Sequence, residues 1–321
     1  MSNFQIKPAI KEGVFLFISL AGASGSGKTF TALELAMGIT GGDVSKIGFI
    51  DTEGRRGLHY ADIFGKFRHL DFEQPFSSMR YVEAIEDIEK DGCSVCIIDS
   101  ASHGHAGTGG MLEFQEEELQ RMAGNDWKKR ESCKMAAWIK PKTHHKKFVE
   151  KFLQSRMHII FCFRAEDKVE MRVETDSKGK RKTSVVSIGW QPICEKNLPY
   201  EMTCSFTLDP AKPGVLTPIK PLQEQHKPFF PLDKPISRKS GELIAKWASG
   251  GEPPQEGQEE IELNDNIVGW IQQINRCTKE EEIREVYKRF TGEKDMYTKD
   301  ADLRLIKACK DSITDLKSIT R

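Results

Sequence analysis

The feature that most constrains the fold is a glycine-rich segment between an apolar run and a helix-forming sequence. The run over residues 14–20 (VFLFISL) is continuous rather than alternating, which predicts a strand buried on both faces. Residues 22–29 (GASGSGKT) follow, and a helical pattern extends from Lys28 to Ile39. A buried strand, a glycine turn and a helix in direct succession are typical of α/β folds.

The glycine segment fits the pattern G-x-x-x-x-G-K-[ST], which binds phosphate. Its glycines let consecutive backbone N–H groups turn toward an anion, and the following helix adds the positive end of its dipole. We expect Lys28 to reach the β- and γ-phosphates of ATP and the Thr29 hydroxyl to bind Mg²⁺. The predicted nucleotide-binding residues are Gly22, Ala23, Ser24, Gly25, Ser26, Gly27, Lys28, Thr29 and Phe30.

Two carboxylates follow predicted strands. Asp99 ends the apolar run at residues 94–100, where a carboxylate can hold hydrated Mg²⁺ in a site with Thr29. Glu53 comes just after the predicted strand 46–51, where a carboxylate can orient water toward the γ-phosphate. For Glu53, spacing alone leaves an ordinary solvated loop glutamate equally open.

The remaining pattern predicts a doubly wound, mostly parallel sheet. Further strands are expected at residues 67–72 and 157–163, with an amphipathic helix over 77–92 between them. After residue 168, alternation on both sides of residues 176–179 predicts a β-hairpin. A strand over 201–208 and a helix over 240–250 are expected to complete the core; the latter pattern is SGELIAKWASG.

Composition predicts a second, smaller unit after the core. We expect a P-loop domain over residues 1–250, a Pro-, Gly- and acid-rich linker over 251–262, and a three-helix module over 263–321. Residues 251–321 hold 16 acidic and 12 basic side chains, which suits protein contact better than phosphate contact. A helical cap that only stabilises the core remains equally open.

The overall charge and apolar content favour a cytoplasmic protein. The chain has 48 basic and 48 acidic residues, and no apolar run approaches the ~20 residues of a membrane span. We expect its eight cysteines to be free thiols. The pairs His103/His105 and His144/His145 have no carboxylate or cysteine at ligand spacing, so no metal site is expected there.

Together these motifs resemble the RecA-type ATPase core. Within that group, DTEGRRGLHYAD, IIDSASH and HIIFCFRAEDK are similar to phage AAA-type nucleotide-binding proteins associated with single-strand annealing, over roughly residues 14–249. The resemblance implies that Glu53 is the catalytic base and Asp99 the Mg²⁺-site acid. It also implies DNA-stimulated ATP hydrolysis, action on single-stranded DNA in recombination, a homo-oligomer, and a location in the bacterial host cytoplasm.

One position departs from the RecA pattern. Recombinases end the strand corresponding to residues 157–163 with an amide that senses the γ-phosphate, whereas this chain has Arg164. We expect Arg164 to sense phosphate by charge or to act as an arginine finger, in its own subunit or across an interface. A surface ion pair with Glu166 or Asp167 is the alternative.

DNA is expected at the loops that follow the central strands. These are the glycine-rich loop 100–110, the predicted hairpin, and residues 128–151, which carry nine Lys or Arg against two Glu, with Trp138 interleaved. A solvated helix face is the alternative for the last stretch. The candidate DNA-binding residues are Lys140, Lys142, Lys146, Lys147, Lys178, Lys180, Arg181 and Lys182.

Two other functions stay open at this point. A P-loop kinase of a small metabolite or nucleotide would need an arginine-rich lid, of which GKRKTS is a poor version, and would leave Glu53 without a role. An ATP-switched adaptor would recruit partners, such as a single-strand-binding or other recombination protein, through the C-terminal helices.

Overall fold

The chain divides by its contacts into two compact units, Met1–Pro254 and Gln255–Arg321. The computed structural model describes residues 13–175, 181–250, 274 and 280–292. In the second unit it describes the helix α11 (Glu280–Gly292), on which the predicted apolar positions Ile283 and Val286 are buried. The predicted linker and most of the three-helix module lie outside the described residues, so the domain boundaries stay a prediction.

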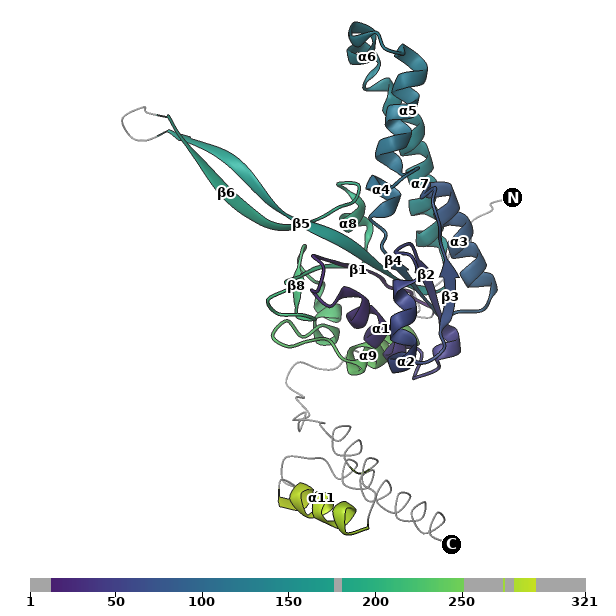
Figure 1. Ribbon diagram of the computed structural model, residues 1–321, viewed down its shortest axis with the longest axis vertical. Coiled ribbons are helices and arrows are strands. Elements are labelled where there is room, and N and C mark those ends of the chain that lie inside the picture. The colour runs from purple at the N-terminus through teal and green to yellow at the C-terminus, as the bar shows by residue number, and fades with distance from the viewer. Residues whose placement is uncertain (1–12, 176–180, 251–273, 275–279, 293–321) are drawn as a thin grey trace, which may run out of the picture. The chain divides into compact units, whose positions relative to one another are not determined.

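A mostly parallel sheet forms the centre of the first unit (Figure 1). Its strand order is β3-β2-β4-β5-β1-β7-β8, with β6 paired to β5 off this path. Pairing is parallel from β3 through to β7 and antiparallel between β7 and β8. The strands are β1 (Phe17–Gly22), β2 (Ile47–Asp51), β3 (Arg68–Asp71), β4 (Val95–Asp99), β5 (His158–Thr175), β6 (Arg181–Pro192), β7 (Cys204–Leu208) and β8 (Leu216–Pro218). The predicted doubly wound sheet is therefore confirmed.

Helices cover both faces of this sheet, which explains why its strands are apolar without alternation. On β1, Ile18 and Leu20 pack with α1 (Lys28–Ile39) and α9 (Arg238–Ala248). Phe17 and Ala21 face the other way, toward α3 (Ser78–Lys90) and α7 (Ile139–Gln154). No helix among the described residues is long and apolar enough to cross a membrane.

β5 is longer than the sequence predicted, because the strand expected over 157–163 and the first strand of the hairpin are one element. Up to Arg164 it pairs with β1, and from Ala165 onward it pairs with β6, as far as Thr175 opposite Arg181. The result is a two-stranded ribbon that projects from the sheet (Figure 1). The predicted hairpin is confirmed, although its turn lies outside the described residues.

A helical arm projects beside the sheet and was not predicted as a unit (Figure 1). It consists of α5 (Met111–Ala123), α6 (Trp127–Cys133) and α7, and α6 lies at its far end. The predicted loop over 100–110 instead contains the short helix α4 (His103–Ala106). Two further short helices, α2 (Ala61–Phe64) and α8 (Leu198–Glu201), complete the described part of the core.

Candidate nucleotide-binding and hydrolysis site

The glycine-rich segment leaves the carboxyl end of β1 and enters α1. Gly25 and Gly27 have φ of +81° and +87°, in the left-handed region that favours glycine. A Cβ on Gly27 would lie 2.9 Å from the backbone nitrogen of Gly214, whose N–H donates to the Ser26 carbonyl at 3.0 Å. No side chain caps the first turn of α1, so its N–H groups face the loop. This geometry suits a phosphate.

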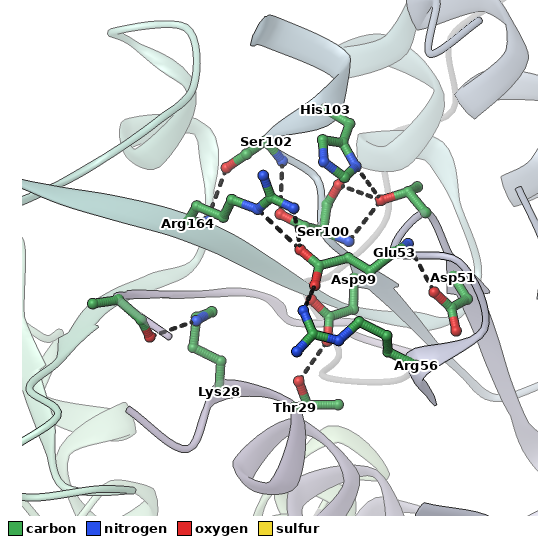
Figure 2. A network of polar contacts seen from close by, with 12 residues as sticks. Lys28, Thr29, Asp51, Glu53, Arg56, Asp99, Ser100, Ser102, His103 and Arg164 are labelled. Carbon is green, nitrogen blue, oxygen red and sulfur yellow. Dashed lines mark hydrogen bonds and ion pairs between the residues drawn. The ribbon is translucent and has the colours of Figure 1, made fainter. Parts of the chain in front are cut away.

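Lys28 turns back across the loop it follows. Its Nζ donates to the Ala23 carbonyl at 2.9 Å (Figure 2). A carbonyl is a weaker partner for an ammonium group than a phosphate is, because the phosphate carries a full charge. Lys28 therefore lies where the β- and γ-phosphates of a bound nucleotide would draw it.

Thr29 and Asp99 meet beneath the loop. Thr29 Oγ1 donates to Asp99 Oδ2 at 2.5 Å (Figure 2). Burial and, to a smaller extent, the nearby charge of Glu53 raise the pKa of Asp99 to about 6, although the hydrogen bond from Thr29 opposes the shift. A hydroxyl and a carboxylate are the hard oxygen donors that Mg²⁺ prefers, and a buried carboxylate gains most from such a cation. The pair therefore fits the expected Mg²⁺ site.

Glu53 lies between two arginines. Oε1 accepts hydrogen bonds from Arg164 Nη2 at 2.8 Å and Nε at 3.0 Å, and Oε2 pairs with Arg56 Nη1 at 3.2 Å (Figure 2). The alternative partners of Arg164 are engaged elsewhere: Glu166 with Lys168 and Asp167 with Ser187. The alternative for Arg164, an ion pair with Glu166 or Asp167, is therefore not what the structure has, and the expected role at the γ-phosphate stays a prediction.

The turn that carries Glu53 is held by Asp51, a buried residue at the end of β2. Its carboxylate accepts hydrogen bonds from the backbone N–H groups of Glu53 and Gly57, both at 2.8 Å, and lies 3.1 Å from His69 Nε2. Asp51 was not singled out in the sequence because an aspartate after a strand is an ordinary turn former. Here it fixes the backbone from which Glu53 projects.

A second network joins the ends of β2, β4 and β5. Thr52 Oγ1 donates to the Ser100 carbonyl at 3.0 Å, accepts from the Ser100 N–H at 2.8 Å and lies 2.7 Å from His103 Nδ1. Ser102 Oγ accepts from the backbone N–H of Arg164 at 2.9 Å (Figure 2). Burial lowers the pKa of His103, and the charge of Arg164 lowers it further. The backbones beside Asp99, Glu53 and Arg164 are therefore linked.

The predicted DNA-binding lysines on α7 differ in their surroundings. Lys140 pairs with Glu118 at 2.9 Å, and Lys146 lies 3.7 Å from Glu150. Lys142 and Lys147 are exposed, with no ion pair among the described residues. The side chains of the four ribbon candidates, Lys178, Lys180, Arg181 and Lys182, lie outside the described part of the chain.

A small cavity lies between α3, α5 and α7, and no sequence pattern indicates it. It is lined by His105, His145, Cys194 and Glu195, from segments that are distant in the chain. Burial lowers the pKa of both histidines and raises that of Cys194 to about 12. Within the described residues, no three His, Cys, Asp or Glu side chains lie close enough together to hold a metal ion.

The mostly parallel sheet and the loop geometry define a P-loop nucleotide-binding domain. Residues 16–203, more than half of the 321, match the AAA domain family, and the chain belongs to that family. It is an AAA-type P-loop NTPase domain, for which NTPase activity in general is indicated.

Two further comparisons add little to this assignment. A KaiC-like protein from the hyperthermophilic archaeon Pyrococcus horikoshii OT3 is 14% identical, with 56% of this chain and 80% of that chain covered and a TM-score of 0.27. This similarity is too low to carry a functional argument. A comparison with curated proteins finds no match.

Proposed function

We propose that this protein hydrolyses ATP with Mg²⁺ and acts on single-stranded DNA in phage-type recombination or annealing, as a homo-oligomer. The observation that carries the hydrolysis step is the position of Glu53. It lies across the carboxyl edge of the sheet from Lys28 and Thr29, on the turn fixed by Asp51. A carboxylate at this place can orient water for attack on a γ-phosphate.

Arg164 and Arg56 would make ATP hydrolysis dependent on their own positions, because both pair with Glu53. Both oxygens of Glu53 are occupied by guanidinium groups, so the carboxylate is not free to accept a proton from water. A γ-phosphate offers a guanidinium more charge and a better bidentate partner than a carboxylate does. Binding of ATP would therefore draw Arg164 toward the phosphate and release one oxygen of Glu53. Bound Mg²⁺ would neutralise the phosphate oxygens beside Thr29 and Asp99.

β5 supplies the proposed route from DNA to this site. Arg164 stands where β5 changes partner from the core sheet to the ribbon. The sequence between β5 and β6 contains the basic candidates Lys178 and Lys180. Contact of this segment with DNA would act on the strand that positions Arg164, which is the proposed physical basis for DNA-stimulated hydrolysis.

The test is the rate of ADP and free phosphate release, with and without single-stranded DNA, measured beside oligomer size. We expect hydrolysis to rise with DNA and to be lost in Lys28→Ala, while Lys239→Ala, at an exposed lysine on α9, leaves the basal rate unchanged. Transfer of the phosphate to a small acceptor, in place of its release, would favour the kinase. Wild-type protein that binds ATP without turnover would favour the adaptor.

A further inference from the structure

The tip of the helical arm, α6 and the residues up to Met135, has a defined structure and takes no part in the nucleotide site. α5 and α7 lie side by side and carry α6 at their far end (Figure 1). Glu118 on α5 pairs with Lys140 on α7 and with Arg121 at 2.8 Å. The bonds from Arg121 and Lys140 lower the pKa of Glu118 to about 2, so its carboxylate stays charged, and its pair with Lys140 persists, well into the acid range.

Arg130 fixes α6 to the arm. Its guanidinium donates to Gln120 Oε1 at 2.8 Å and to the Gly124 carbonyl at 3.1 Å, and it also pairs with Glu116. The Asp126 carboxylate accepts from the first N–H groups of α6, those of Lys128 and Lys129. Arg130 and Asp126 are therefore structural charges, and the N–H groups of Lys128, Lys129 and Arg130 are already bonded to Asp126.

The exposed side chains of the tip include an aromatic ring and several lysines, together with Glu131 and Met135. Trp127 is 72% exposed, and the Lys128 ammonium lies 5.9 Å from the centre of its ring. Lys129 and Lys134 are also exposed, and Lys134 Nζ lies 4.0 Å from Glu131 Oε2. A tryptophan is rarely left this accessible in a soluble domain, because it loses the burial of a large apolar surface.

We propose that this tip binds single-stranded nucleic acid, with an unpaired base stacked on Trp127 and phosphates contacted by Lys128 and Lys129. An exposed indole on a lysine-bearing helix, with one ammonium near the ring, is an arrangement that can stack a base and contact the phosphate backbone. The inference deepens the proposed function, on whose DNA substrate it rests, and locates a binding surface outside the ribbon and α7.

Other occupants fit the tip less well. A membrane-lying helix needs a broad apolar stripe, whereas the sequence of α6 is WKKRESC, with Trp127 as its one large apolar side chain. Duplex DNA offers phosphates but no free base face, because its bases are already stacked and paired. Trp138, the aromatic residue that the sequence suggested, is half-buried and therefore a poor stacking surface.

The test compares full-length variants in their affinity for a fluorescein-labelled oligo(dT). Trp127→Ala is expected to weaken binding about 5- to 150-fold, the range measured for one base–aromatic stack. Lys128→Ala with Lys129→Ala should lower the slope of log K against log salt by about 0.7 for each phosphate that the variant no longer neutralises. Met135→Ala, at a 78% exposed position on the same tip, and Trp138→Phe should bind as the wild type does.

Four results would overturn the inference. The first is an oligo(dT) affinity of Trp127→Ala equal to that of the wild type, and the second is a loss of affinity in Met135→Ala as large as that in Trp127→Ala. The third is an equal loss of affinity of Trp127→Ala for duplex DNA of the same length. The fourth is binding to anionic vesicles, but not to the oligonucleotide, that depends on Trp127. Its failure is separable from that of the proposed function. DNA-stimulated hydrolysis with unchanged binding in Trp127→Ala rejects the tip alone, whereas tip-dependent binding without stimulation rejects the coupling alone.

Discussion

Arg164 donates two hydrogen bonds to one carboxylate oxygen of Glu53, at 2.8 and 3.0 Å, across 111 residues of sequence. The other oxygen of Glu53 faces Arg56. The two ion pairs orient the Glu53 carboxylate and also engage both of its oxygens. Glu53 can therefore act as a base only when at least one of the two arginines moves away. Single substitutions can test the role of each of these residues, and of the buried residues in the sheet that supports them.

Replacing Glu53 with Gln keeps the size of the side chain and removes its basicity. We expect ATP to bind with near wild-type affinity while hydrolysis slows about 100-fold or more, the usual contribution of a general base. Nucleotide affinity and single-turnover hydrolysis should be measured on the same preparation. Glu166→Gln is the control, since Glu166 pairs with Lys168 outside the site. Turnover of Glu53→Gln at the wild-type rate would reject the catalytic assignment.

Removing Arg164 should affect hydrolysis more than nucleotide binding. Arg164→Ala is expected to slow saturated turnover at least tenfold and to abolish its increase with single-stranded DNA, because a guanidinium fork at the γ-phosphate is lost. Arg164→Lys should restore only part of the rate, since an ammonium is a point charge. Arg55→Ala is matched to it: Arg55 lies on the same turn as Glu53 but pairs with Asp71. Equal effects of both changes would contradict the role of Arg164.

Asp99→Asn should separate stability from function. The pKa of Asp99 is raised by burial from 3.8 to about 6, so above pH 6 its ionised form disfavours the folded nucleotide-free protein, by about 3 kcal/mol at most. Asn removes that charge and still accepts from Thr29. Thermal unfolding without nucleotide should therefore shift upward at pH 7.5 and much less at pH 4.5. Mg²⁺-dependent nucleotide affinity should fall in the same variant. A variant with lower unfolding temperature at pH 7.5 would contradict this account.

We expect the folded protein to lose stability in mild acid because the buried side chain of His158 resists protonation. Its buried Nδ1 accepts the Leu16 N–H at 3.1 Å, and burial lowers its pKa to about 4. The unfolded chain takes up this proton below about pH 6.5, whereas the folded chain does so only near pH 4. Stability from this group is therefore complete above pH 6.5 and declines toward pH 4, by about 3 kcal/mol at most.

Urea unfolding across that pH range measures the His158 effect. His158→Gln keeps an acceptor for Leu16 and removes the titration, so its pH dependence should be flatter than that of the wild type. His59→Gln, at an exposed imidazole, should leave the profile as it is. Identical profiles for wild type and His158→Gln would assign the acid sensitivity to other groups.

The sequence was most informative where local chemistry and backbone geometry agree. α1 begins at Lys28 and ends at Ile39 as predicted, because the glycine turn and the apolar pattern both point to a helix there. Thr29 contacts Asp99, and Glu53 follows the neighbouring strand, because parallel strands bring their carboxyl ends to the edge where α1 begins.

What the sequence missed depends on contacts between distant segments. The pairing of Arg164 with Glu53 has no local signal, whereas Glu166 and Asp167 are adjacent in the chain and so offered the nearer partners. The sequence of the arm indicates only a basic stretch, because periodicity does not show that Lys140 is paired with Glu118 while Trp127 is exposed. Charge patterning cannot distinguish a cation that holds two helices together from one that faces solvent.

The position of β1 in the sheet also determines when the phosphate loop can be completed during synthesis. β1 lies between β5 and β7, so its two neighbours emerge from the ribosome well over 100 residues after it. Until then the edges of β1 are unpaired, and α1 lacks the α9 surface that packs against it. The nascent N-terminal half is therefore expected to need protection from aggregation, and to gain nucleotide affinity only after β7 and α9 have emerged.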